Sequence, residues 1–235
     1  MTINSFYLCI DMGDLVYSLS IAKILEVETL FIDGGCDFVK FNWDSANFIS
    51  PLLKYQSYIE RAELYNDQPY DYNYGLHPEN KPVVVGTNLT EFHASKFNLN
   101  NHKNIYDPWL EAPKLSENTI LNKKVVINRS KRYHGNPQFY ADFLKFYRPE
   151  HLLFLGLPDE YSSFNQDFGL KDGQIEYIET LDVMTLASII NTIPCFVGNE
   201  SLICSIATGL GKNCFIEYCP NAANYIYPRQ NINYF

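Results

Sequence analysis

The chain has 235 residues, of which 46% are hydrophobic and 19% charged, so we expect a folded protein of one large or two small domains. Its formal net charge is −9, from 18 Lys and Arg against 27 Asp and Glu, which excludes general binding to nucleic acid or anionic membranes. Aromatic residues make up 15% of the chain, and its 18 tyrosines suit cores, interfaces and sugar-binding walls alike.

Strands and helices alternate in the first half of the chain, judged by its apolar periodicity. Continuous apolar runs predict buried strands, and apolar residues at helical spacing predict helices. We expect Asp14 to stand at the N-cap of the first helix. The predicted strands lie at 6–10, 29–33 and 82–85, and the predicted helices at 15–25 and 49–64, with an irregular loop at 65–80.

A stretch without sustained periodicity, 113–123, is interpreted as a linker between an N-terminal domain, 1–112, and a C-terminal domain, 124–235. The alternation of strands and helices resumes after it. Two α/β halves, each with a parallel sheet, are the architecture that this order favours. In the second half the predicted strands lie at 125–127, 152–155, 195–197 and 214–216, and the predicted helices at 137–147, 183–190 and 202–210.

The six cysteines and five histidines show no spacing typical of a metal site, so we expect reduced, buried thiols and no metal centre. The N-terminus lacks a basic segment followed by a long apolar run, and no apolar stretch approaches the ~20 residues that span a bilayer. We therefore expect a cytoplasmic protein without a transmembrane segment. The glycine patterns of dinucleotide-binding sites, P-loops and hydrolase elbows are also missing.

Ligands of open α/β sheets bind beyond the carboxyl ends of the strands, so the loops that follow strands are the places to search. Gly13 and Asp14 follow the first strand. Asp14 is either a plain helix cap or a general base that takes a proton from a hydroxyl group. Its position alone favours the cap.

A basic loop follows the strand at 125–127. Five of the 18 cations lie within 123–132, a concentration that needs a cause in an acidic chain. It is either a pyrophosphate site near a helix N-terminus or a solvated basic turn. Next to it, His134 is a candidate site residue or an ordinary surface histidine, and Tyr133 a candidate cleft residue.

A third loop, 198–201, lies between the strand at 195–197 and the next helix. Asn199 or Ser201 is expected to cap that helix. The exposed amides at its start can also bind a phosphate. Glu200 could accept hydrogen bonds from sugar hydroxyls. Glu160, after the strand at 152–155, is a weaker candidate of the same kind.

Two segments carry a resemblance to a known family. Residues 12–19, which contain a Gly-Asp pair before an apolar helix, and residues 196–201 with 207–211 resemble the first-loop and donor-binding signatures of glycosyltransferase family 9. This family comprises the ADP-heptose–lipopolysaccharide heptosyltransferases and their relatives. The resemblance implies the GT-B fold, with two Rossmann-like α/β domains facing across a cleft, reduced in size in this chain.

The resemblance also implies roles for individual residues. Asp14 would be the catalytic base of a metal-independent, inverting transfer from a nucleotide-diphosphate sugar to an acceptor hydroxyl, with no cofactor besides the donor substrate. Tyr133 and His134 are possible neighbours of this site because of their position at the basic loop. The donor and its phosphates would be bound by Gly13, Arg129, Ser130, Arg132, Glu160, Asn199, Glu200 and Ser201.

Two classes of function follow from these observations. The first is a glycosyltransferase, of hexosyl- or heptosyltransferase type, acting on an unidentified glycan, lipid-linked sugar or other acceptor. The second is a non-catalytic protein that binds a nucleotide or nucleotide-sugar and derives from such an enzyme. The short N-terminal half leaves little material for an acceptor site, so a homodimer that shares the site and an open site are alternatives.

Overall fold

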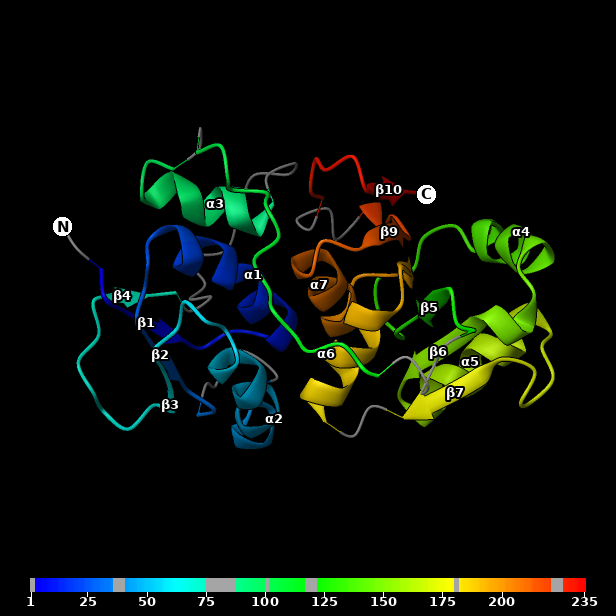
Figure 1. The fold of residues 1–235 in the computed structure, drawn as a ribbon, viewed down its shortest axis with the longest axis horizontal. Coiled ribbons are helices and arrows are strands. Elements are labelled where there is room, and N and C mark those ends of the chain that lie inside the picture. Colours follow the sequence, from blue (N-terminus) through cyan, green and yellow to red (C-terminus); the bar gives the residue numbers. More distant parts are fainter. Residues whose placement is uncertain are drawn as a thin grey trace. The chain divides into compact units, whose positions relative to one another are not determined.

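The structure is a computed structural model that describes residues 3–35, 41–74, 88–99, 102–116, 122–179, 182–220 and 226–235. The chain divides into two compact units, each with its own sheet (Figure 1). The first unit comprises residues 1–112 and 224–227, and the second 113–223 and 228–235. The linker expected at 113–123 is thus grouped with the second unit, and a short C-terminal segment returns to the first.

The first unit is built on a four-stranded parallel sheet with the strand order β3-β2-β1-β4. In β1, Phe6 and Leu8 are fully buried while the alternate residues are half-buried, so one face of the sheet is more open than the other. The strands are β1 (Ser5–Leu8), β2 (Thr29–Ile32), β3 (Arg61–Leu64) and β4 (Tyr72–Asn73), and the helices are α1 (Met12–Ile24), α2 (Trp43–Lys54) and α3 (Leu89–Lys96).

Two expectations for the first unit are wrong. The helix expected at 49–64 is α2, which begins earlier because Asn42 accepts a hydrogen bond from the Ser45 amide at 2.9 Å and caps it; residues 61–64 pair with β2 as a strand instead. The N-cap of α1 is Asp11, and Asp14 lies within the first turn of the helix. The strand expected at 82–85 lies outside the described residues.

The C-terminal segment is tied into the first unit by aromatic and polar contacts. Tyr227 is buried, and its ring stacks on Tyr17 of α1 with 5.0 Å between the centroids. Its hydroxyl forms a 2.6 Å hydrogen bond with that of Thr90 in α3. The Asn88 amide also donates to the Ile226 carbonyl at 2.9 Å. Part of the aromatic content of the chain therefore anchors this return.

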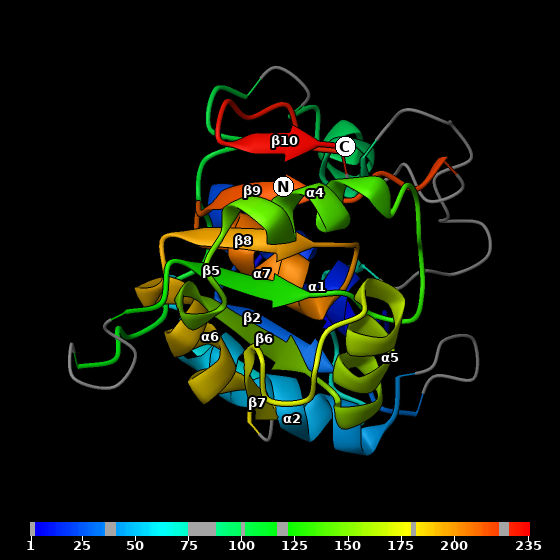
Figure 2. The same ribbon diagram turned by 90° about the vertical axis from the view of Figure 1, so that its right-hand side faces the viewer.

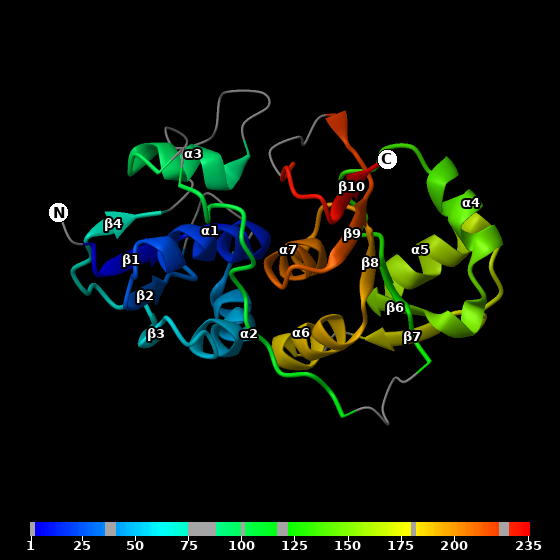
Figure 3. The same cartoon turned by 45° about the horizontal axis from the view of Figure 1, so that its top comes forward.

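The second unit contains a six-stranded parallel sheet in the order β10-β9-β8-β5-β6-β7, which is the order of the dinucleotide-binding α/β fold (Figure 2). Helices α4 and α5 cover one face of this sheet, and α6 and α7 the other (Figure 3). A 3-10 helix (Pro149–His151) precedes β6. The strands are β5 (Val125–Asn128), β6 (Leu152–Gly156), β7 (Glu176–Glu179), β8 (Cys195–Gly198), β9 (Asn213–Ile216) and β10 (Ile232–Tyr234), and the helices are α4 (Gln138–Phe146), α5 (Pro158–Phe168), α6 (Val183–Thr192) and α7 (Leu202–Gly209).

The central strands of this sheet are buried on both faces, which is why they appear in the sequence as continuous apolar runs. On one face, Val125 and Ile127 pack with Phe154 and Phe164 in a cluster that also includes Tyr140. Two parallel α/β sheets confirm the predicted fold class. None of the helices in the described ranges is long and apolar enough to cross a bilayer.

Cys9 is disulfide-bonded, which corrects the expectation of reduced thiols throughout. It lies just beyond the end of β1 and is half-buried, whereas the sequence analysis placed it inside a buried strand. Cys195, Cys204, Cys214 and Cys219 are not in disulfides. Burial raises the pKa of Cys195 to about 11 and that of Cys214 to about 12, so both remain protonated thiols at neutral pH.

Candidate functional site

The strand order of the second unit locates a candidate site. The chain runs outward from β5 through β6 to β7, and then on the other side of β5 through β8 and β9 to β10. The direction therefore reverses between β5 and β8, and ligands of open α/β sheets bind beyond the carboxyl ends of the strands at such a point. The loops that follow β5 and β8 are the basic loop and the 198–201 turn singled out in the sequence.

Asn128, the last residue of β5, links the loops around this point. It is buried, and its amide nitrogen donates to the Leu155 carbonyl at 2.9 Å and to the Glu160 carboxylate at 3.3 Å. Its amide oxygen accepts from the Ser201 hydroxyl at 2.9 Å. One buried amide therefore connects the carboxyl ends of β5, β6 and β8, a role that the sequence analysis did not assign.

Asn199 holds the basic loop against the turn after β8. Its fully buried side chain accepts from the Ser130 amide at 2.8 Å and donates to the Ser130 carbonyl at 3.0 Å. It also donates to the Arg132 carbonyl. The Ser130 hydroxyl donates to the Glu200 carbonyl at 3.4 Å. The polar atoms of Asn199 are thus directed at the loop backbone, which gives this residue a positioning role.

Arg129 lies in a buried ion pair. Its Nε and Nη2 donate to the two carboxylate oxygens of Glu217 at 3.0 and 3.1 Å, and Nη1 donates to Asp167 at 2.8 Å. The guanidinium also lies 5.4 Å from the ring centroid of Tyr140. Two carboxylates neutralise its charge, so Arg129 supports the loop, while the side chains of Lys131 and Arg132 are exposed.

Glu217, just beyond β9, is fully buried and holds both ends of the loop from 129 to 135. Besides Arg129, it accepts a hydrogen bond from the Gly135 amide at 2.7 Å, and its own amide donates to the Gly198 carbonyl at 2.7 Å. Gly135 has no room for a side chain, because a Cβ would lie 1.9 Å from the Tyr218 carbonyl oxygen. No local signal in the sequence predicts the pairing of Glu217 with Arg129, since the two are 88 residues apart.

The tip of the basic loop carries the remaining candidates. Tyr133 adopts a φ of 56°, in the left-handed region, and the Arg132 guanidinium lies 5.2 Å from its ring centroid. The His134 Nε2 donates to the Ser130 carbonyl at 2.6 Å, so this histidine stabilises the loop. Lys131 forms an exposed ion pair with Asp159 at 2.7 Å.

The N-terminus of α7 lies beside this loop. Ser201 caps the helix, since its hydroxyl accepts from the Cys204 amide at 3.2 Å while it donates to Asn128. Glu200 precedes the cap and is half-buried. A helix N-terminus with exposed lysine and arginine side chains nearby is an environment that favours an anion.

Glu160 lies in the first turn of α5, at the carboxyl end of β6. Its carboxylate accepts from the Leu157 amide at 3.0 Å and from Asn128. Burial raises the pKa of Glu160, and these two hydrogen bonds oppose the rise. Gly156 has a φ of 154°, and a Cβ there would lie 2.6 Å from Glu160 Oε2, so this approach requires glycine.

Gly13 and Asp14 belong to the first unit, in the first turn of α1 directly after β1. Asp14 is half-buried. Burial raises the pKa of the nearby Tyr74, and the negative charge of Asp14 contributes to that rise. Among the described residues, no group of three or more His, Cys, Asp and Glu side chains is arranged to hold a metal ion.

Comparison with known proteins identifies the fold. No family model and no curated protein sequence matches the chain. A glycosyltransferase family 9 structure from Veillonella parvula DSM 2008 superposes with a TM-score of 0.70 over 100% of this chain and 87% of its own, at 10% identity. The chain has the glycosyltransferase family 9 fold.

Two Escherichia coli structures support this result. Heptosyltransferase WaaC with ADP-2-deoxy-2-fluoro heptose matches with a TM-score of 0.56 and 8% identity, over 98% of this chain and 92% of its own. ADP-heptose lps heptosyltransferase II matches with a TM-score of 0.59 and 11% identity, over 99% and 90%. The resemblance to glycosyltransferase family 9 noted in the sequence is therefore confirmed at the level of the fold.

Proposed function

We propose that the protein is a glycosyltransferase that moves a sugar from a nucleoside-diphosphate sugar to an acceptor hydroxyl. The observation that carries this proposal is the convergence, at the reversal point of the second sheet, of a basic loop and the N-terminus of α7. The family 9 fold supports it, as does the nucleotide-sugar analogue in the similar structure of WaaC.

In this proposal the exposed Lys131 and Arg132 and the amides at the start of α7 bind the diphosphate. Arg129 acts through the loop backbone, because its guanidinium is paired with Glu217 and Asp167. Asn199 and Ser130 hold the loop in place. The remaining candidates, which would contact the nucleoside ribose and the donor sugar, are Glu160, Glu200 and Ser201.

Asp14 is the proposed general base. It would take the proton from the acceptor hydroxyl as that oxygen attacks the anomeric carbon, and the bond from that carbon to the diphosphate oxygen would break with inversion. The departing diphosphate carries the negative charge that develops, and the loop cations with the helix amides would stabilise it.

Binding of nucleotides tests the donor site. A panel of nucleoside diphosphates and nucleoside-diphosphate sugars is screened by thermal shift. A ligand at a hundred times its dissociation constant raises the free energy of unfolding by about 2.7 kcal/mol. Arg132→Ala and Lys131→Ala should weaken the binding, because each removes a cation from the loop. Lys145→Ala, which changes an exposed lysine of α4, is the matched control. A wild-type protein that responds to no member of the panel contradicts the proposal.

A measurement of sugar transfer distinguishes the glycosyltransferase from a non-catalytic nucleotide-binding protein. The second function is favoured by the neutralised charge of Arg129, which is paired with Glu217 and Asp167. With a donor identified by the panel, Asp14→Asn should abolish sugar transfer and leave nucleotide binding unchanged. Asp44→Asn, in the exposed first turn of α2, is the matched control. Full activity of Asp14→Asn would remove Asp14 from the mechanism, and the absence of any transfer by the wild type would favour the binding protein.

A further inference from the structure

Three tyrosines of the first unit lie close together within or beside its strands. Tyr7 is in β1, Tyr65 follows β3 directly, and Tyr70 precedes β4. The ring of Tyr7 stacks on that of Tyr70 with 4.8 Å between centroids, and meets the ring of Tyr65 edge-on at 4.7 Å. The rings of Tyr65 and Tyr70 are 6.1 Å apart, so the three form one cluster.

A carboxylate lies beside this cluster. Asp33, which follows β2, accepts a hydrogen bond from the Tyr7 hydroxyl at 2.5 Å through Oδ2, and one from the Gly35 amide at 2.7 Å through Oδ1. Both are charge-assisted bonds that hold the carboxylate in one orientation. The bond from Gly35 closes the turn after β2, and the bond from Tyr7 fixes the carboxylate against the tyrosine cluster.

Part of the aromatic surface near Asp33 is exposed. Tyr70 is 39% exposed and Trp43, at the start of α2, is 44% exposed. A Cβ on Gly35 would lie 3.1 Å from Asp33 Oδ1 and 3.8 Å from Trp43 Cζ2, which places the carboxylate and the indole around the same small space. The carboxyl edge of a parallel sheet, to which β1, β2 and β3 all contribute, is where ligands bind in this architecture.

We propose that Asp33, Tyr70 and Trp43 form a saccharide subsite that holds the sugar of the acceptor. The apolar C–H face of a sugar ring packs on an aromatic face, and its hydroxyls donate to an oriented carboxylate. The negative charge of Asp33 disfavours phosphorylated or acidic ligands, so the subsite takes a neutral sugar. This inference rests on the proposed function, because it names the class of acceptor for that reaction.

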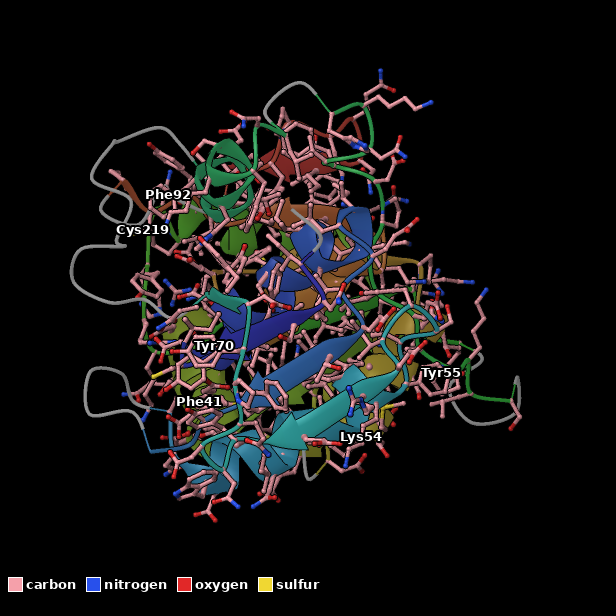
Figure 4. The ribbon with its side chains drawn as sticks, turned by 90° about the vertical axis from the view of Figure 1, so that its left-hand side faces the viewer. Phe41, Lys54, Tyr55, Tyr70, Phe92 and Cys219 are labelled. Atoms are coloured by element: carbon pink, nitrogen blue, oxygen red, sulfur yellow. The ribbon has the colours of Figure 1, made fainter. Side chains whose placement is uncertain are left out.

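The test measures saccharide binding to the full-length chain by saturation-transfer NMR, which needs no transfer activity. The probes are maltose, lactose and N-acetyllactosamine, followed by an array of neutral free glycans. Tyr70→Ala and Asp33→Asn should each weaken the binding at least tenfold. Tyr55→Ala is the matched control, since this tyrosine is 46% exposed in the same unit and lies well away from Tyr70 (Figure 4).

Because Tyr70 is exposed, its alanine variant should fold, and thermal unfolding of the full chain followed by circular dichroism checks this in every variant. The proposal is overturned if the wild type binds no neutral glycan, or if Tyr70→Ala and Asp33→Asn bind as the wild type does. A loss in Tyr55→Ala of equal size also overturns it. Nucleotide binding that persists when saccharide binding is absent leaves the donor-site proposal intact, so the two can fail separately.

Discussion

Replacing Glu217 by alanine removes the acceptor of two buried hydrogen bonds, from Arg129 Nε at 3.0 Å and Nη2 at 3.1 Å, and of a partly buried one from the Gly135 amide at 2.7 Å. The Arg129 side chain is 6% exposed, and its remaining partner, Asp167, is half-exposed. Removing one member of a buried ion pair costs about 3–5 kcal/mol where the other charge is left uncompensated, and the half-exposed Asp167 compensates Arg129 only in part. We expect Glu217→Ala to lose stability in that range.

The double variant Arg129→Met with Glu217→Leu separates the cost of the uncompensated buried charge from the cost of the lost hydrogen bond to the Gly135 amide. Apolar side chains that replace both members of a buried pair are often neutral, so most of the loss should be recovered. The Gly135 amide would still lack its acceptor, which costs about 1–3 kcal/mol. The double variant should therefore be more stable than Glu217→Ala alone.

Urea unfolding of the full chain, followed by circular dichroism, measures these differences. The control is Asp159→Ala, which breaks the Lys131–Asp159 ion pair, whose side chains are 57% and 59% exposed. Such exposed pairs contribute about 0–1 kcal/mol. If Glu217→Ala is destabilised by no more than this control, the claim that a buried pair holds the basic loop is refuted.

Two further predictions concern stability. Burial lowers the pKa of His93 from 6.5 to about 3, so the folded state keeps it neutral on the ring of Tyr74 while the unfolded chain takes up a proton. The free energy of unfolding should fall as the pH drops from about 6 to 4, and His93 should contribute about 1.4 kcal/mol per pH unit to this slope. In urea titrations the slope of the wild type should exceed that of His93→Phe by this amount. Gly156→Ala should cost about 1–3 kcal/mol in thermal unfolding, because it adds a contact with Glu160 to a strained φ. Gly169→Ala, at a φ of 64° with nothing within 4 Å, should cost less, and an equal loss would exclude the contact as a cause.

The accuracy of the strand predictions depended on position in the sheet. The central strands β5 and β8 were located to within one residue, because strands buried on both faces are continuous apolar runs. All four edge strands were missed. In β3 and β7 half of the residues are charged and most are at least partly exposed, so these strands form by pairing with a neighbour rather than from a local pattern.

The helix predictions likewise succeeded where the signal was local and failed where it was not. The prediction at 183–190 agrees with α6, whose cap is local, since Asp182 accepts from the Thr185 amide at 2.7 Å. The helix after β6, Pro158–Phe168, was not predicted. Its first turn contains Glu160, whose carboxylate is held by Asn128 from another strand, so the sequence analysis identified the candidate but not its setting.

The sequence by itself determined that the chain forms two parallel α/β halves and that its cations concentrate at 123–132, because strand burial and charge density are local properties. Only the tertiary structure decided what those cations can do. The pairing of β9 with β8 and of β8 with β5 brings Glu217 to Arg129, whose charge it neutralises, while Lys131 and Arg132 stay exposed. Burial and charge pairing depend on residues distant in the sequence, so the fold decides which charged side chains of this acidic chain are paired and which are exposed.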